Sequence, residues 1–524
     1  FQKANNNDTK CDLVTGEERV LVSDNGEPSS HVACTVEMTS INNEYEVAVI
    51  DEIQMLRDPQ RGWAWTRALL GICADEIHLC GETTALKLIQ DICSITGESI
   101  EVRKYKRLTK LTTENTALVS LANIQPGDCI VCFNKNDIYS VSGEVEQLGY
   151  ECAVIYGGLP PGAKLAQANR FNDPEDACKI LVATDAIGMG LNLSIRRVIF
   201  YSLMKPTMNE KGEKSMSCIS TSQALQIAGR AGRFKTQFEE GFVTTFNASD
   251  LNTLKDILSS NPESIFKAGL HPTADQIELY AYHLPQASLS NLVDIFITLS
   301  TMDDSLYFMC SIEDFKYLAD MIQHISLPLR ARYVFCCAPI NRKMVFVCTM
   351  FMKFAHQYSI NEPVSSDWLC TVIGWPFSTP VTIMQLVHLE AVFDVLDLYL
   401  WLSYRFPDLF PHSPAVRIMQ KELDLQIQKG VVNITNLVKA SKDKETSQYR
   451  PSKSNKHVET ERINVADDTE KEQDRDIEIG GGKLTQRLLA QGLITPSMLK
   501  ELQKEWKNFD NDISRKRTEK YKKK

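Results

Sequence analysis

Short apolar runs that end on polar side chains recur through the first half of the chain, with helix-like segments between them. Residues 47–50, 129–133 and 180–183 are such runs and contain several β-branched side chains. A short continuous apolar run is typical of a strand buried in a parallel sheet. The repeated order of strand, polar loop and helix therefore predicts an α/β fold with a parallel sheet.

From residue 256 onward the apolar positions change to helical spacing, as in residues 275–282 and 386–402, with prolines in the short connections. This pattern predicts a bundle of helices. The most apolar of these segments, 386–402, contains Glu390, Asp394 and Asp397. Acidic side chains at these positions favour a buried bundle helix, so we expect no membrane-spanning segment.

The composition fits an ordinary globular protein with several domains. A chain of 524 residues is longer than one hydrophobic core usually supports. The formal net charge of −10 predicts that any nucleic-acid site is a confined basic channel. The 15 cysteines follow no repeating framework, which favours reduced, buried thiols over disulfides. Cys129 and Cys132 form a lone C-x-x-C pair within a strand, which argues against zinc.

Two carboxylates, Asp51 and Glu52, follow the apolar run 47–50 directly. Ligands of parallel α/β sheets bind at the carboxyl ends of the strands. There Asp51 is suited to hold Mg²⁺, and Glu52 is suited to orient or deprotonate an attacking water. The alternative is a chance pairing, because many apolar strands are followed by two acids.

A second signal is the pattern Q-x-x-G-R-x-G-R, which places Gln226 and Gly229 beside Arg230 and Arg233. On one helical turn the two arginines would point to nearly the same side. The glycines allow close approach to a phosphate or another backbone. Two fixed guanidinium groups suit a triphosphate whose charge must be stabilised during phosphoryl transfer. The alternative is a charged helix with ordinary surface arginines.

Taken in order, the segments DEIQ at 51–54, TDAIGMGLN at 184–192 and QIAGRAGR at 226–233 resemble motifs II, V and VI of superfamily 2 helicases. Four further segments narrow the resemblance: TGEE at 15–18, PGDCIVCF at 126–133, IYGGLPP at 155–161 and GLHPT at 269–273. Together, over residues 10–440, they are similar to the mitochondrial degradosome ATP-dependent RNA helicases, which are DExH-type enzymes.

The resemblance implies two RecA-like parallel-sheet domains, the first incomplete, followed by an α-helical C-terminal domain. The expected regions are 1–105 for the rest of the first RecA-like domain, 106–255 for the second, 256–440 for the helical domain, 441–482 for a disordered linker and 483–524 for amphipathic tail helices with a basic end. We also expect residues 100–103 to form the last strand of the first domain.

The resemblance also implies a role for individual residues at an ATP site. Asp51 and Glu52 would act on Mg²⁺-ATP and water, with Mn²⁺ as an alternative ion. Gln54 would link the nucleotide to the second domain. The residues expected to reach or border the nucleotide from the second domain are Gln226, Gly229, Arg230, Arg233, Gly190 and Asn192.

RNA contacts follow from the same resemblance. Thr15, Gly16, Thr35 and Glu37 would touch RNA from the first domain, and Thr184 from the second. In an enzyme of this kind, Gly81 and Glu82 sit where a motif that couples the two domains belongs, although the common Ser-Ala-Thr sequence is absent. A plain strand-to-loop transition is the alternative for this segment.

One departure concerns the phosphate loop G-x-x-x-x-G-K-[ST], whose amides and lysine hold the nucleotide phosphates. No such sequence precedes Asp51. Residues 480–483 are Gly-Gly-Gly-Lys, but Leu484 follows instead of Ser or Thr, so we interpret them as a hinge before a helix. Because the chain begins with Phe1, we expect an N-terminal part with the loop and any targeting peptide to be missing.

The expected function is ATP-dependent unwinding of duplex RNA in the 3′-to-5′ direction, with RNA–DNA and DNA duplexes as further substrates. The resemblance implies a 3′-exoribonuclease partner such as polynucleotide phosphorylase, and the mitochondrial matrix, with the nucleus as a second location. Two alternatives stay open: a nucleotide-incompetent subunit that binds RNA or a nuclease, and a DNA helicase. Whether this chain hydrolyses ATP by itself is open too.

Overall fold

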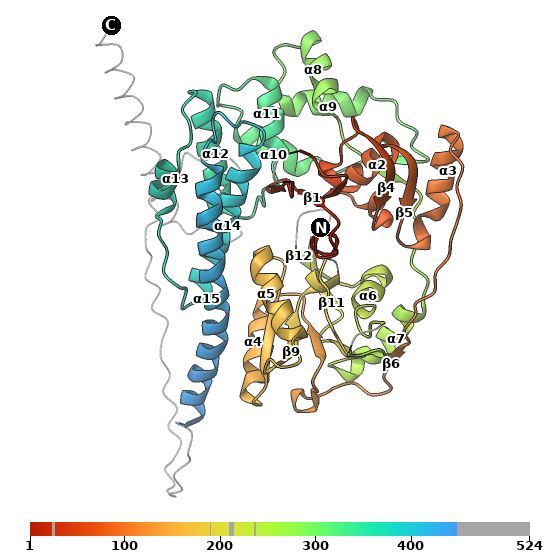
Figure 1. Ribbon diagram of the computed structural model, residues 1–524, viewed down its shortest axis with the longest axis vertical. Coiled ribbons are helices and arrows are strands. Elements are labelled where there is room, and N and C mark those ends of the chain that lie inside the picture. The colour runs from red at the N-terminus through yellow and green to blue at the C-terminus, as the bar shows by residue number, and fades with distance from the viewer. Residues whose placement is uncertain (24–26, 189, 209–213, 235–236, 448–524) are drawn as a thin grey trace, which may run out of the picture. The chain divides into compact units, whose positions relative to one another are not determined.

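The computed structural model describes residues 1–23, 27–188, 190–208, 214–234 and 237–447 (Figure 1). The chain divides into two compact units, Phe1–Arg450 and Pro451–Lys524. The second unit lies outside the described residues. The predicted tail helices at 483–524, and all but the first residues of the predicted linker at 441–482, therefore lie outside them too.

The first domain contains two small sheets. One has the order β2-β1-β3, and in the other β4 and β5 run parallel with Ile50 opposite Leu79. The elements are α1 (Gln2–Asn5), β1 (Cys11–Val14), β2 (Arg19–Val20), β3 (His31–Cys34), η1 (Val36–Met38), β4 (Glu44–Ile50), η2 (Ile53–Arg57), α2 (Gly62–Gly71), β5 (Cys73–Leu79), η3 (Thr83–Ala85) and α3 (Leu86–Thr96).

Two predictions for this domain are wrong in detail. Val47 and Val49 on β4 are 53% and 65% exposed, so the strand is buried on one face only. Successive side chains point to opposite faces of a strand, so Ala48 and Ile50 are buried on one face of β4 while Val47 and Val49 share the exposed face. Residues 100–103 form no strand: Ile100 and Val102 are exposed, and none of the described strands pairs with them.

The second domain is built on a six-stranded, wholly parallel sheet with the order β6-β13-β10-β7-β9-β8. This confirms the predicted parallel α/β fold. Its elements are β6 (Leu111–Thr113), η4 (Leu121–Asn123), β7 (Asp128–Val131), α4 (Lys135–Gln147), β8 (Glu151–Ile155), α5 (Pro161–Asn172), β9 (Cys178–Ala183), η5 (Asp185–Gly188), β10 (Arg197–Phe200), β11 (Met204–Met208), β12 (Lys214–Cys218), α6 (Thr221–Ala228), β13 (Gly241–Thr245), η6 (Ala248–Asp250) and α7 (Leu251–Ser259).

Helices dominate the rest of the described chain, as predicted. Two short strands in this region, β14 and β15, pair in parallel. The elements are β14 (Ala268–Leu270), α8 (Ala274–His283), α9 (Leu289–Leu299), β15 (Tyr307–Met309), α10 (Glu313–Met321), α11 (Leu329–Cys336), α12 (Val345–Ser359), α13 (Ser366–Ile373), α14 (Ile383–Ser403) and α15 (Ser413–Ser447). Helix α15 runs past residue 440, where the helical domain was expected to end.

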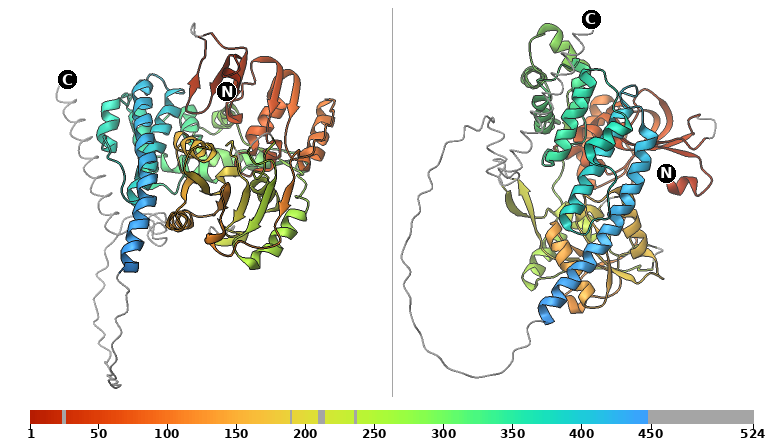
Figure 2. Two further views of the ribbon diagram at one scale, coloured as in Figure 1. Left: turned by 60° about the horizontal axis from the view of Figure 1, so that its bottom comes forward. Right: turned by 90° about the vertical axis from the view of Figure 1, so that its left-hand side faces the viewer.

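The hydrophobic cores join the helical region to both sheet domains. Ile265, Ala268 and Leu306 belong to the core of the first domain. Most of the later helices share one core with a face of the second sheet, including Ile130 of β7 and Leu396 of α14. Helix α15 lies alongside α14 and contacts α4 and α5 (Figure 2). The helical region therefore packs against both sheet domains.

Helix α14 is buried on nearly all sides, which suits its almost continuous apolar sequence. Lys135 Nζ and Tyr156 OH both donate to the carboxylate of Glu390, which is 6% exposed. This pairing satisfies a buried charge and fixes α14 to the second domain. None of the helices in the described residues is long and apolar enough to cross a membrane. All 15 thiols are free, but the prediction that they are buried is wrong for five that are exposed: Cys34, Cys73, Cys80, Cys218 and Cys337.

Candidate active site

The end of strand β4 fixes the acidic pair. Asp51 and Glu52 follow Ile50 directly, as predicted, before η2 begins. Glu52 has φ 53° and ψ 45°, a left-handed conformation that is uncommon outside glycine and often accompanies functional sites. Asp51 Oδ1 accepts from Glu52 N at 2.9 Å, and the Asp51 carbonyl accepts from Trp65 Nε1 at 2.9 Å. Both acids are thus held at the carboxyl end of a parallel pair of strands.

Gln54 ties this acidic turn to the next loop. Its side chain is 6% exposed, and Nε2 donates to Glu52 Oε2 while Oε1 accepts from Glu82 N at 3.1 Å. At Gly81, φ is 154°, and an added Cβ would lie 2.3 Å from Gln54 Oε1. The close approach therefore requires glycine at this position. The DEIQ segment and Gly81–Glu82 form one hydrogen-bonded unit.

Glu82 also contacts the second domain. Its Oε1 accepts from Ser222 Oγ at 2.6 Å, and its Oε2 accepts from Thr84 Oγ1 at 3.2 Å. Ser222 lies in the first turn of α6, the helix that leads to Gln226 and the two arginines. Of the two interpretations of this segment, the structure favours the one in which it joins the domains.

The arginines lie after α6, not on it. The helix begins after the N-cap Ser220 and ends at Ala228. The prediction that Arg230 and Arg233 share one helical turn is therefore wrong. Gly232 has φ 67°, and an added Cβ would lie 2.3 Å from Gly241 N. The chain thus leaves the helix through a tight turn that only glycine accommodates, and we call residues 229–233 the arginine loop.

Arg230 binds the loop that carries two of the predicted nucleotide neighbours, Gly190 and Asn192. Its Nε donates to Gly188 O at 3.0 Å and its Nη1 to Leu191 O at 3.4 Å. Gln226 lies beside the same turn, since a Cβ added to Gly188 would sit 3.5 Å from Gln226 Oε1. The structure therefore brings Gln226 and Arg230 together around Gly188.

Charged side chains of both domains influence the pKa of Arg230. Burial lowers the pKa of Arg230, while the charges of Glu52 and Asp51 raise it and that of Arg233 lowers it. Acids from the first domain and arginines from the second therefore act on one another. Arg233 is exposed, and its main-chain N donates to Phe238 O at 2.8 Å.

Three predicted nucleotide neighbours, Gly190, Asn192 and Gly229, have surroundings that show no nucleotide role. Gly190 has φ 76°, and a Cβ added there would meet nothing within 4 Å. Asn192 is exposed, and its carbonyl accepts from Asn172 Nδ2 at 2.7 Å. The carbonyl of Gly229 accepts from Arg107 Nη1 at 2.8 Å. None of these contacts assigns a nucleotide role, so the three assignments stay predictions.

Comparison with known families covers most of the chain. The DEXQ-box helicase domain of Suv3 matches residues 1–105, and the helicase conserved C-terminal domain matches 104–235. The Suv3 C-terminal domain 1 matches 317–359, and the ATP-dependent RNA helicase SUV3 C-terminal domain matches 386–433.

Several curated proteins are similar over nearly the whole chain. The mitochondrial ATP-dependent RNA helicase SUV3 homolog of Drosophila melanogaster is 66% identical over 97% of this chain and 65% of its own length. The mitochondrial ATP-dependent RNA helicase SUPV3L1 is 59% identical in Danio rerio, over 98% of this chain and 68% of that protein. The Homo sapiens protein is 58% identical over 99% and 67%.

The chain belongs to the Suv3 helicase family. It spans slightly less than two thirds of the two Drosophila relatives, 65% in Drosophila melanogaster and 64% in Drosophila pseudoobscura pseudoobscura. The Suv3 domain matches agree with the order in which the structure places the first sheet domain, the second sheet domain and the helices.

The residues that the Suv3 resemblance assigns to RNA in the first domain gather after two adjacent strands. Strands β1 and β3 run parallel, and Thr15 and Thr35 follow their ends, with Thr35 N donating to Val14 O at 3.2 Å. Thr15 Oγ1 accepts from Glu18 N at 2.8 Å. The structure therefore brings Thr15 and Thr35 together at one sheet edge.

The other RNA-assigned residues have different neighbours. Gly16 lies against α14, since an added Cβ would sit 3.0 Å from Trp401 Cδ1. Glu37 accepts from Arg61 Nη2 at 2.6 Å. Thr184 lies in the second domain at the end of β9, where its Oγ1 accepts from Ala186 N at 3.2 Å.

The sequence interpretation missed the helical residues that contact residues 16–19. Arg405 stacks 3.4 Å from the ring centroid of Trp401, and burial lowers the pKa of Arg405 to about 10. Arg417 Nη2 donates to Glu17 O at 3.0 Å, and Arg19 N donates to Tyr404 OH at 3.0 Å. Two aromatic side chains and an arginine within residues 401–405 (Trp401, Tyr404 and Arg405) were the signal that could have found this contact.

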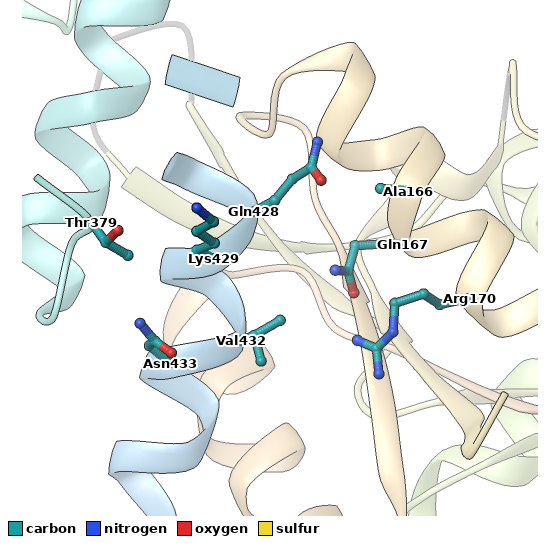
Figure 3. A pocket seen from close by; sticks show the side chains of 8 residues that line it. All are labelled: Ala166, Gln167, Arg170, Thr379, Gln428, Lys429, Val432 and Asn433. Carbon is teal, nitrogen blue, oxygen red and sulfur yellow. The ribbon is translucent and has the colours of Figure 1, made fainter. Parts of the chain in front are cut away.

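A separate cavity of about 400 Å³ lies between α5 and α15 (Figure 3). Its lining is Ala166, Gln167, Arg170, Thr379, Gln428, Lys429, Val432 and Asn433. None of the residues predicted for nucleotide or RNA is among these eight. This cavity is therefore distinct from the acid and arginine groups described above.

Proposed function

We propose that the complete protein is an ATP-dependent helicase that separates RNA duplexes in the 3′-to-5′ direction and also acts on RNA–DNA and DNA duplexes. The observation that carries this proposal is the chain of contacts from Glu52 through Gln54 and Glu82 to Ser222. It connects the predicted hydrolytic acids with the helix that leads to the arginine loop. A nucleotide held between these groups would contact both domains at once.

The acids of the first domain and the arginines of the second would have different roles in ATP hydrolysis. Asp51 would hold Mg²⁺, which shields phosphate charge when bound, and Mn²⁺ is the alternative ion. The exposed carboxylate of Asp51 at a strand end fits such a hard cation. Glu52 would orient the attacking water. Arg233, exposed at the end of the arginine loop, would stabilise charge on the transferred phosphoryl group, and Arg230 would support it.

Movement along RNA would follow from opening and closing of the two domains. Closure on ATP brings the acids and the arginines together, and hydrolysis releases them. Thr15, Gly16, Thr35 and Glu37 would contact RNA from the first domain and Thr184 from the second. Phosphate contacts of this kind carry no base sequence, so we expect binding with little sequence preference.

The names of the relatives support the cellular part of the proposal. They are named mitochondrial ATP-dependent RNA helicases, so we place the protein in the mitochondrial matrix, with the nucleus as a second location. We further propose that it delivers unwound RNA to a 3′-exoribonuclease such as polynucleotide phosphorylase. Co-purification of the complete protein with such a nuclease would test this part separately.

The direct test is strand separation by the complete protein. Duplexes with a 3′ or a 5′ single-stranded overhang, made of RNA or DNA, are incubated with ATP or without nucleotide. We expect ATP-dependent separation of the 3′-overhang RNA duplex, and its loss in Glu52→Gln. Efficient separation by Glu52→Gln, or separation without ATP, would contradict the proposal. A strict preference for DNA would identify a DNA helicase instead.

A further inference from the structure

The segment between the two sheet domains carries an arginine whose contacts reach the arginine loop. Helix α3 ends at Thr96 and β6 begins at Leu111. Residues 97–110 therefore join the domains, and Arg107 lies in this segment. Two of its basic neighbours, Arg103 and Lys104, are exposed. Arg103 forms an ion pair with Glu101 on the surface.

Arg107 spans the arginine loop with one guanidinium group. Its Nη1 donates to Gly229 O at 2.8 Å, and its Nη2 donates to Gly232 O at 2.7 Å and to Ala231 O. Its Nε donates to Thr109 O at 3.0 Å. The accepting carbonyls of the loop flank Arg230 and directly precede Arg233. One side chain therefore holds the backbone on both sides of Arg230.

The chemistry of these contacts suits arginine in particular. The carbonyls at the end of a helix lack helical partners and carry a partial negative charge. A planar fork of donors can bind several of them at once, whereas a lysine ammonium is a single point of charge. Gly229 lies against this guanidinium group, since an added Cβ would be in van der Waals contact with Arg107 Nη1 at 3.6 Å. Burial lowers the pKa of Arg107.

Other contacts of the arginine loop come from within the second domain. Gly232 packs against Gly241, and Arg230 is bound to the carbonyls of Gly188 and Leu191. Those contacts are internal to the second domain. Arg107 differs because it belongs to the segment that must change its path when the two domains move relative to each other.

We propose that Arg107 is a positioning residue that sets the arginine loop and passes movement of the interdomain segment to Arg230 and Arg233. This inference rests on the proposed function of the two arginines. Arg107 acts through the main chain of the loop and does not touch the nucleotide. Its loss leaves both arginines present but misplaced, and a misplacement of about 1 Å at a catalytic group can slow a reaction about 100-fold.

The test uses Arg107→Ala and Arg107→Lys in the complete protein, with Arg103→Ala as the matched control from the same segment. RNA-stimulated ATP hydrolysis gives kcat and KM for ATP, and thermal unfolding checks the fold. We expect kcat to fall about 10- to 100-fold in Arg107→Ala and less in Arg107→Lys, with KM for ATP nearly unchanged. Arg103→Ala keeps wild-type values. If Arg107→Ala does not fold, Arg107→Lys carries the test.

A double variant separates this inference from the proposed function. Under single-turnover conditions, Arg107→Ala is expected to cause a smaller further loss in an Arg233→Ala background than in wild type, because the part of its effect that acts through Arg233 is already absent. An equal loss in both backgrounds overturns the inference. So does normal hydrolysis by both Arg107 variants when Arg233→Ala is impaired. Normal hydrolysis by Arg233→Ala instead refutes the arginine role in the proposed function.

Discussion

Ser222 Oγ lies 2.6 Å from Glu82 Oε1, and this hydrogen bond joins the loop after β5 to the helix before the arginine loop. Through Gln54, the same Glu82 is connected to Glu52. A conformational change at Glu52 can therefore be transmitted to the second domain through this hydrogen bond. Hydrogen bonds to a charged group contribute about 1.5–3 kcal/mol, which is enough to bias a domain movement.

Ser222→Ala is expected to weaken coupling without removing a catalytic group. The variant keeps Glu52, Arg230 and Arg233, so we expect ATP hydrolysis within about twofold of wild type and duplex separation reduced about tenfold. Both rates are measured on the same RNA substrate. Ser249→Ala, at an exposed serine of η6, is the control. Equal reduction of hydrolysis and separation would contradict a coupling role.

Gly232→Ala tests the turn that ends the arginine loop. Gly232 has φ 67°, and a Cβ would lie 2.3 Å from Gly241 N, so both strain and a backbone clash oppose alanine. Gly149 has φ 89°, and nothing lies within 4 Å of an added Cβ. Gly149→Ala therefore introduces backbone strain without a clash. We expect a loss of unfolding free energy of about 1 kcal/mol for Gly149→Ala and at least about 3 kcal/mol for Gly232→Ala. Urea unfolding measures both, and equal losses would show that no clash exists.

The carboxylate of Asp397 on α14 predicts a dependence of stability on pH. Burial raises its pKa from 3.8 to about 7, helped by the charges of Glu17 and Asp394 and opposed by a hydrogen bond from Gln420 and by Arg417. The folded protein thus keeps a proton that the unfolded chain releases. The stability from this proton is complete below pH 3.8 and is lost as the pH rises through 7.

Asparagine at position 397 does not titrate, so Asp397→Asn should gain stability relative to wild type as the pH rises. One pKa unit corresponds to about 1.4 kcal/mol, and partial exposure of the side chain reduces the effect, so we expect a gain of about 1–2 kcal/mol between pH 5 and pH 8. Urea unfolding at both pH values measures it. Asp408→Asn, at an exposed aspartate, serves as the control. A pH-independent difference would rule out the proposed titration.

The contact between residues 16–19 and α14 predicts a further RNA effect. Trp401 and Arg405 stack beside Gly16, which the family resemblance assigns to RNA. Trp401→Ala would release both Arg405 and the main chain at Gly16. We expect RNA affinity to fall about tenfold, since loss of an aromatic or cation–π contact costs about 1–2 kcal/mol. Fluorescence anisotropy with single-stranded RNA measures it, and unchanged affinity would separate this contact from RNA binding.

The sequence predicted the elements better than it predicted their connections. Apolar runs ending at Ile50 and Ala183 correctly marked strands, although only the run ending at Ala183 is buried on both faces. The end of α6 at Ala228 was missed, because the repeated Gly-Arg spacing fits a helix as well as a turn. Strand prediction at 100–103 failed because an apolar alternation forms a strand only where a neighbour pairs with it.

Contacts between segments far apart in the chain could not be predicted from the sequence, for a physical reason. The bond from Ser222 to Glu82 depends on how the two domains dock, and the bonds from Arg107 to the arginine loop depend on the path of the interdomain segment. No local pattern encodes that geometry. The predicted acids and arginines could be named because phosphoryl transfer restricts which residue types can serve it. The residues that support these acids and arginines can be of many types, so only the structure identifies them.

The central claim is that Arg233 and the two acids that follow β4, Asp51 and Glu52, act on one ATP molecule, and RNA-stimulated ATP hydrolysis by the complete protein tests it most directly. We predict that RNA accelerates hydrolysis by wild type and that Arg233→Ala lowers the rate by about 10³-fold or more while RNA binding is retained. Near-normal hydrolysis by Arg233→Ala, with RNA bound as in wild type, would contradict the account.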